Sequence, residues 1–449
     1  MKYSNTHDMK RITMMTVWLA MASSSSLGQQ RWTMDECVAY AVTHATEVQL
    51  QQIETERRTA DSRLATLGLL PTVQAQVSGQ YSWGRNIDPE TNTYNNVTTF
   101  NNYYQLYASL PVFDGGQTLR AFKQARLAKA NSASAMQKVR EDKAIDVMAK
   151  YVEAVYAERS IVLATEKLAD SQALLHKTRR MYELGVKSRP DVVQMESQVA
   201  EDDYNLLHQR HTARLAMLAL KQAMNYPATD SMALDTVIVT PLLADAPVQA
   251  TVASYGQWAP SVKNADYTVK NARMTWLSQR AELWPSLYLN AGVSTNYYKN
   301  LSQTGDFQSF GPQFKNNLGE YVAVTLSLPL FVPSMMRSAR RAKAAYQTAV
   351  VEAAATRRKV ADGVTQAIYD RDGYAREVAS MERKLQSDSL AYHLTRRKYE
   401  EGMLSTFDLH TASQTLIESK VRLLQMRMML VMKDKLVNYY KGMPLWTLK

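Results

Sequence analysis

The sequence HKTRRMYELGVKSRPD spans residues 176–191, and a second copy, HLTRRKYEEGMLSTFD, spans residues 393–408. Nine of the sixteen positions are identical, in the pattern H-x-T-R-R-x-Y-E-x-G-x-x-S-x-x-D, and the two glycines lie 217 residues apart (402 − 185). Chance likeness between two capped turns is the alternative, but it would have to place nine matches in register. The repeat therefore predicts an internally duplicated fold.

Each copy predicts a helix, a tight turn and a second helix. Gly185 follows the first helix, where a glycine adopts the left-handed conformation at no steric cost. Ser188 and Asp191 then form an S-x-x-D capping box, which satisfies the free N–H groups at the start of the return helix. The second copy repeats the device with Gly402, Ser405 and Asp408.

Composition narrows the classes of protein. The chain has 449 residues and a net charge of +11, but its Lys and Arg residues alternate with Asp and Glu along helical stretches. We therefore expect solvated helix faces and no nucleic-acid partner. Cys37 is the only cysteine, so no internal disulfide can form. Lipidation of Cys37 is an alternative, but residues 33–36 lack the small apolar side chains that lipoprotein processing requires.

The N-terminus predicts a secretory signal peptide over residues 1–28. Lys2, Lys10 and Arg11 precede an apolar run over residues 12–22, and small residues follow up to Gly28. Beyond this segment, no apolar run reaches the ~18 residues that a transmembrane helix needs.

The first structural repeat is expected over residues 29–225. A capping box at residues 33–36 opens a helix towards Gly68, and a period of two then predicts strands over 72–84 and 103–113 with a polar loop over 85–102. The second strand ends in a strand-to-helix corner, LPVFDGG, which includes Pro111, Gly115 and Gly116.

Two long helices follow the corner. Residues 117–184 contain no Pro or Gly, which corresponds to about 100 Å of helix if it is continuous. Apolar residues recur every seven positions in the return helix, which favours coiled-coil packing over an ordinary bundle core. They are Val192, Val199, Leu206, Ala213 and Leu220 in the first copy, and Leu409, Leu416, Leu423, Leu430 and Val437 in the second.

The second repeat, residues 257–440, has the same plan. A linker over 226–256 contains three prolines and a short β-prone segment, 236–240. A helix over 260–283 leads to strands over 286–298 and 319–331, separated by a loop over 299–318. Pro329 and Pro333 mark the second strand-to-helix corner, the second turn spans 402–408, the last helix runs to about Tyr440, and residues 441–449 form a tail.

The four strands are each long enough to cross a bilayer at a tilt, and each has one apolar face. A half-buried sheet of a soluble protein would show the same alternation. If the strands do span a membrane, four cannot close a barrel, and open strand edges are not tolerated in lipid. Several chains must then pool their strands, although the number of chains does not follow from this argument.

The corner motif, the paired Y-E-x-G…D reversals and the duplicated strand–strand–long-helix plan resemble the TolC-like outer-membrane factors of Gram-negative tripartite efflux and type I secretion systems. The resemblance implies an α+β membrane protein that forms a homotrimer, with a twelve-stranded barrel in outer-membrane lipid continued by an α-helical tunnel across the periplasm. It also implies a passive duct without enzyme activity or cofactor. Its expected partners are a periplasmic adaptor and an inner-membrane transporter.

The resemblance also assigns roles at the reversals. Asp408 matches an acidic position that lines the tunnel constriction, where a ring of carboxylates would attract cations. Asp191 and Tyr399 match a pair that hydrogen-bonds between the two halves and holds the tip closed. Leu404 and Thr411 depart from the family, in place of an arginine and an acidic residue. Adaptor hairpins are expected to contact the turns at Gly185, Ser188, Gly402 and Ser405.

Simpler roles remain open for these residues. Asp191 and Asp408 are equally consistent with plain helix capping. The arginine pairs 179–180 and 396–397 are expected to be solvated or helix-end charges, with adaptor contact as the alternative. His208 and His211 have helical spacing for a metal, but no motif accompanies them, and we expect no metal site. Competing functions are a periplasmic coiled-coil adaptor or scaffold without a barrel and a secreted pore-forming toxin.

Overall fold

The computed structural model describes residues 31–87, 92–236, 241, 243–302 and 308–446. The expected signal peptide and the β-prone residues 237–240 therefore lie outside the described residues. The chain divides into two compact units, unit 1 (Met1–Leu50, Val139–Gln257 and Ala361–Lys449) and unit 2 (Gln51–Lys138 and Trp258–Val360). Each unit draws segments from both sequence repeats.

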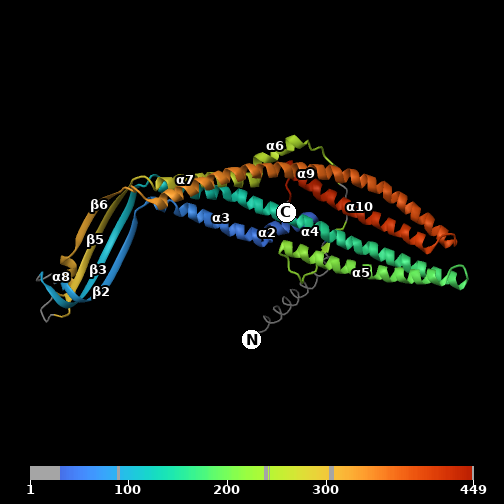
Figure 1. Ribbon diagram of the computed structural model, residues 1–449, viewed down its shortest axis with the longest axis horizontal. Helices are drawn as coiled ribbons and strands as arrows, with labels where there is room; N and C mark the ends of the chain where they lie inside the picture. The colour runs from blue at the N-terminus through green and yellow to red at the C-terminus, as the bar shows by residue number, and fades with distance from the viewer. Residues whose placement is uncertain (1–30, 88–91, 237–240, 242, 303–307, 447–449) are drawn as a thin grey trace, which may run out of the picture. The chain divides into compact units, whose positions relative to one another are not determined.

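Each half of the chain has one strand hairpin followed by two long helices, with shorter helices before the hairpin (Figure 1). In the first half of the chain they are β1 (Arg31–Trp32), α2 (Met34–His44), α3 (Thr46–Leu64), η1 (Leu67–Leu69), β2 (Thr72–Ile87), β3 (Tyr94–Phe113), α4 (Gln117–Glu183), α5 (Arg189–Met224) and β4 (Ala233–Leu234). In the second half they are α6 (Val248–Trp258), α7 (Pro260–Ala281), β5 (Ser286–Asn300), α8 (Phe310–Asn316), β6 (Gly319–Ser327), α9 (Pro333–Glu400) and α10 (Thr406–Tyr440).

Unit 2 contains a four-stranded antiparallel sheet in the order β2-β3-β5-β6. The register aligns Val73, Ala108, Ala291 and Val322 in one row across all four strands. Because side chains alternate along a strand, this row lies on one face, which we call the apolar face. Ten large side chains of this face are each at least 37% exposed in the single chain, and they are Val73, Val77, Tyr81, Trp83, Leu106, Leu289, Val293, Val322, Val324 and Leu326.

Unit 1 contains the two helix reversals. The seven-residue spacing does mark the core, because all five apolar positions of α10 are buried and four of the five of α5 are buried, Val199 being half-buried. The cluster nearest the reversals consists of Leu174, Met195, Tyr392, Tyr399, Leu409 and Leu416. Among the described residues, no helix combines the length and the apolar character needed to span a bilayer.

The structure corrects the expected limits of several elements. The expected loop over 85–102 is wrong for most of its length, because β2 continues to Ile87 and β3 begins at Tyr94, where Thr and Tyr side chains suit a strand. The strand expected over 319–331 ends at Ser327, since Pro329 cannot donate to a ladder. The loop expected over 299–318 contains α8.

Two further expectations were incomplete. The helix that begins with the capping box of Thr33 and Glu36 does form, but it is interrupted at Ala45, whose backbone is extended (φ −62°, ψ 140°). Nothing in the sequence explains that break. The linker over 226–256 is partly structured. It contains β4, which pairs in parallel with β1, and most of α6.

Candidate functional site at the paired reversals

The first reversal adopts the expected capped turn. Gly185 has a φ of 74°, and its N–H donates to the Tyr182 carbonyl at 3.0 Å. The Ser188 N–H and hydroxyl both donate to Asp191 Oδ2, at 3.0 and 2.6 Å. The cap uses Asp191 Oδ2 and orients the carboxylate, so Asp191 Oδ1 remains available for another partner.

The second reversal is built in the same way. Gly402 has a φ of 80° and donates to the Tyr399 carbonyl at 3.0 Å. Ser405 donates from its N–H and hydroxyl to Asp408 Oδ2 at 3.2 and 2.6 Å, and the Asp408 N–H returns a bond to Ser405 Oγ at 3.2 Å. Both capping boxes predicted from the sequence are therefore confirmed.

Side chains at the tips join the two reversals. Thr406 donates its hydroxyl to Asp191 Oδ1 at 2.7 Å, while Lys187 Nζ donates to the Leu404 carbonyl at 2.8 Å. The turns also touch, since a Cβ added at Gly402 would lie 3.3 Å from Val186 Cγ1. Hydrogen bonds from Ser188 and then from Thr406 lower the pKa of Asp191, and burial opposes them in part. The carboxylate therefore caps α5 with one oxygen and links the repeats with the other.

Tyr399 makes the most buried link between the repeats. Both Tyr399 and Thr178 are 0% exposed, and their hydroxyls lie 2.6 Å apart. Thr178 donates to the Leu174 carbonyl at 2.8 Å, so Tyr399 is the donor between the two hydroxyls. Lys187 Nζ lies 4.5 Å from the centroid of the Tyr399 ring, a cation–π contact.

Asp191 and Tyr399, the pair expected from the family resemblance, thus bond different partners. In the described part of the chain, no hydrogen bond joins their side chains; each instead bonds a threonine of the opposite repeat. Neither Thr406 nor Thr178 carried a signal in the sequence beyond its place in the repeat. Because a threonine hydroxyl can bond its own helix, only the fold shows that these two also reach across.

Of the remaining expected tip residues, Asp408 and Thr411 lie apart from these links, while Leu404 takes part through its carbonyl. Asp408 is exposed, and the hydrogen bonds from Ser405 lower its pKa. Leu404 is half-buried and packs against the tyrosine-containing cluster. Thr411 is exposed and donates to the Phe407 carbonyl at 3.0 Å. Asp408 is therefore free to face solvent or other copies of the chain.

A second set of links, which we did not expect from the sequence, lies between α4 and α9. Asp170 accepts hydrogen bonds from Tyr392 and, at 2.6 Å, from Arg396. Arg396 also contacts Glu400 at 3.2 Å, and Lys177 contacts Glu400 at 3.1 Å. Arg396, expected as a solvated or helix-end charge, is thus part of a network. Arg179 pairs with Glu196 at 2.7 Å.

The first strand-to-helix corner in unit 2 requires glycine for its left-handed backbone and close packing. Gly115 and Gly116 have φ values of 64° and 81°, and a Cβ at Gly115 would lie 2.9 Å from the Ala281 Cβ. Pro111 lies at the irregularity in the β3–β5 register, and Pro333 is the first residue of α9, where its missing N–H has no cost. Pro329 lies in the connection between β6 and α9.

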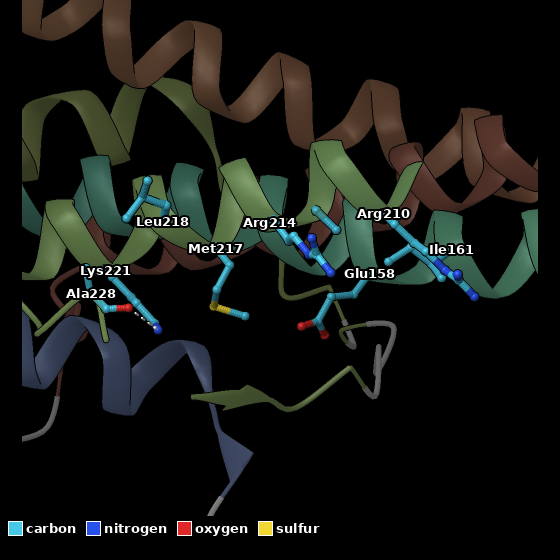
Figure 2. A pocket seen from close by; sticks show the side chains of 9 residues that line it. Glu158, Ile161, Arg210, Arg214, Met217, Leu218, Lys221 and Ala228 are labelled. Carbon is cyan, nitrogen blue, oxygen red and sulfur yellow. Dashed lines mark hydrogen bonds between the residues drawn. The ribbon is translucent and has the colours of Figure 1, made fainter. Parts of the chain in front are cut away.

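A cavity of about 410 Å³ lies along α4 and α5 in unit 1 (Figure 2). Its lining combines apolar side chains with Arg210, Arg214 and the half-buried Glu158, whose pKa is raised by burial. Lys221 lies at one end and donates to the Ala228 carbonyl at 3.1 Å, which fixes the segment after α5. Among the described residues, no group of three His, Cys, Asp or Glu side chains is placed to hold a metal ion.

Comparison with solved structures shows the same fold. The chain is similar to the outer membrane protein VceC from Vibrio cholerae, with a TM-score of 0.75 and 15% identity over 93% of this chain and 97% of that one. It is also similar to the Campylobacter jejuni CmeC outer membrane channel, with a TM-score of 0.78 and 15% identity over 92% and 86% of the chains. The chain is likewise similar to the open state of the Neisseria gonorrhoeae MtrE outer membrane channel, with a TM-score of 0.71 and 18% identity over 93% of this chain and 89% of that one.

No curated protein matches the sequence. At the sequence level, the profile of the outer membrane efflux protein family matches residues 40–226 and 256–431, which together are most of the chain and include both reversals. The chain belongs to the outer membrane efflux protein family.

Proposed function

We propose that three copies of this chain form an outer-membrane exit duct for a tripartite efflux pump or type I secretion system, gated at the paired reversals. The main support for the duct is the apolar face of the sheet, which exposes large side chains on each of β2, β3, β5 and β6 in the single chain. Apolar surface of this extent is stable against lipid or against another subunit.

The sheet edges require other copies. β2 and β6 are the outer strands of the sheet, so each has one edge without a strand partner among the residues that the structure describes. In a membrane these edges must pair, and strands contributed by further copies satisfy them in a closed barrel. Family membership supports three copies and hence twelve strands. It also supports a periplasmic location for the helices, where an adaptor protein and an inner-membrane transporter would dock.

The reversals have the properties of a gate that can open. Near the turns, hydrogen bonds around Asp191, Lys187 and Tyr399 join the repeats. The buried apolar cluster and the ion pairs of Asp170 and Glu400 add to them. Breaking the bonds of Asp191 and Lys187 costs little when water replaces each partner, whereas the buried bond between Tyr399 and Thr178 must reach water before it can be replaced. We therefore assign Asp191 and Tyr399 to closure, each through its own threonine. Leu404 contributes a carbonyl and packing in place of a charge.

Asp408 is assigned to ion selection. It is exposed, and the hydrogen bonds from Ser405 favour its charged form and lower its pKa. Three such carboxylates around a narrow axis would attract cations. Thr411, a neutral residue in place of a second acidic one, leaves Asp408 as the main contributor. Its substitution should therefore have a large effect.

Two measurements test these assignments. Purified protein should insert into lipid bilayers as a heat-sensitive oligomer and conduct ions; a monomer that stays in water would contradict the duct and favour an adaptor without a barrel. In bilayer recordings, Asp408→Asn should reduce cation preference and block by multivalent cations. Unchanged selectivity would leave Asp408 as a helix cap only. Glu401→Gln, an exposed tip carboxylate outside the capping boxes, is the matched control.

A further inference from the structure

The face of the sheet opposite the apolar face is polar but uncharged. It takes the even-numbered positions of β2 and β5 and the odd-numbered positions of β3 and β6, and we call it the polar face. Among the described residues of these four strands, the charged ones are Arg85, Lys299 and Glu320, and all three fall on the apolar face by the same alternation. The polar face therefore offers only neutral side chains, mostly amides, hydroxyls and tyrosine rings.

Two tyrosines of the polar face lie in one row of the sheet, on either side of a glycine. The register aligns Gln74, Tyr107, Gly292 and Tyr321 across the four strands. A Cβ added at Gly292 would lie 2.7 Å from Tyr321 Cε1 and 2.9 Å from the Tyr321 hydroxyl oxygen. The Tyr321 ring thus occupies the space directly above the glycine, and any larger residue at position 292 would displace it.

Hydrogen bonds to amides hold both rings along the surface of the sheet. The Tyr321 hydroxyl accepts from Gln105 Nε2 at 3.4 Å. Because Gln105 belongs to β3, the Tyr321 side chain reaches from β6 across the width of β5. Tyr107 donates its hydroxyl to Gln74 on β2. Tyr321 is 40% exposed and Tyr107 is half-buried, so part of each ring remains accessible from the polar side.

We propose that Tyr107 and Tyr321 form a binding site for aromatic rings of the cargo in the lumen. The proposal rests on the duct proposed above, in which the apolar face meets lipid and the polar face lines the lumen. Three copies would then place six of these tyrosines (2 × 3) in a belt around the lumen.

The chemistry of the polar face favours aromatic groups over ions. Aromatic pairs gain from offset-stacked and edge-to-face arrangements in addition to the burial of apolar area. The neighbouring amides and hydroxyls carry no charge, so they select neither cations nor anions. Asp408 at the tip would then discriminate by charge, while the tyrosine belt would recognise rings. Binding through a few ring contacts is weak enough to allow release, as passage through a duct requires.

Two synthetic peptides test the site, one with lysine alternating with phenylalanine and one with lysine alternating with cyclohexylalanine. They have equal charge and nearly equal size. Each is added on the side of a planar bilayer opposite the helices, and single-channel recordings of the full-length protein measure the dwell time of each current reduction. We expect the phenylalanine peptide to dwell roughly two- to twelvefold longer. Cyclohexylalanine has the larger apolar surface, so hydrophobic adhesion alone would give the opposite order.

Substitutions assign the effect to the two rings. Tyr107→Leu with Tyr321→Leu should abolish the preference for phenylalanine, and each single substitution should reduce it. Tyr321→Phe keeps the ring without the bond to Gln105 and should retain most of the preference. Tyr81→Leu is the matched control, because Tyr81 is a tyrosine of the apolar face that is 54% exposed, and it should change nothing.

Three results would overturn the inference or separate it from the duct. Equal dwell times, or a longer dwell of the cyclohexylalanine peptide, would end the proposal, and this comparison needs only the unsubstituted channel. A preference for phenylalanine that persists without both tyrosines would contradict the assignment to Tyr107 and Tyr321. Failure of the unsubstituted protein to form any channel would instead contradict the duct.

Discussion

The buried hydrogen bond between Thr178 and Tyr399 gives the most specific expectation for the gate. In Tyr399→Phe, the Thr178 hydroxyl still has the Leu174 carbonyl as acceptor, at 2.8 Å. In Thr178→Val, by contrast, the Tyr399 hydroxyl remains at a site that is 0% exposed, with its partner lost. The two variants remove the same 2.6 Å contact but leave different residues behind.

The magnitudes follow from that difference. Losing an ordinary hydrogen bond costs about 0.5–1.5 kcal/mol, so Tyr399→Phe should raise the open-to-closed ratio roughly two- to twelvefold for each chain. A buried donor without an acceptor costs about 1–3 kcal/mol, so Thr178→Val should raise the ratio roughly five- to 160-fold. The double variant should cost less than the sum, because no unpaired hydroxyl remains.

Single-channel recordings in planar bilayers measure the open fraction of each variant. Tyr182→Phe is the matched control, because Tyr182 occupies the equivalent position of the first repeat but is 43% exposed; its open fraction should equal that of the unsubstituted protein. A larger open fraction in Tyr399→Phe than in Thr178→Val would contradict the assignment of Tyr399 as the buried donor. The assignment of Tyr399 to closure is refuted if neither substitution changes the open fraction.

Lys187→Met should raise the open fraction several-fold in the same recordings. It removes both the bond to the Leu404 carbonyl and a cation–π contact with Tyr399 that contributes about 0.5–2 kcal/mol. Lys187→Arg should retain most of the closure. Gly115→Ala should lower the thermal midpoint of the oligomer, because the left-handed backbone and the 2.9 Å approach to the Ala281 Cβ together cost about 1–3 kcal/mol; Gly68→Ala, which has open space and an ordinary φ, should not lower it. The pKa of Asp191 is lowered from 3.8 in the folded state, so its contribution to closure is complete above that value and is lost as the pH falls through the lowered pKa. Recordings at about pH 5 should therefore show the Asp191 link intact, and an effect of Asp191→Asn that is as large at pH 5 as at neutral pH.

Local signals in the sequence predicted much of the fold. The glycines at the reversals and the S-x-x-D boxes determine the backbone within a few residues of themselves, so Gly185, Gly402 and both capping boxes appear as expected. The seven-residue spacing identified the buried positions of α10, because residues at that spacing lie on one face of a helix. Alternation placed the strands, and the apolar face follows from it.

Contacts between distant segments could not be predicted in this way. Thr178 and Asp170 meet residues more than 200 positions away, and their partners depend on how α4 and α9 are rotated against each other. Gln313 and Asn317 look like ordinary loop amides in the sequence, and only the unequal lengths of β5 and β6 give them a strand edge to complete. The acceptor of Arg396, Asp170, likewise lies on another helix, and the position of Arg396 near a helix end does not reveal it.

In the proposed duct, several copies of the chain pool their strands in one membrane-inserted channel. Images of purified particles in lipid nanodiscs, averaged along the axis of the channel, test it most directly by counting subunits. The proposed duct expects threefold symmetry around a single pore, with helical density that projects from one side of the lipid disc. Particles that contain one chain, or that remain outside the disc, would contradict it.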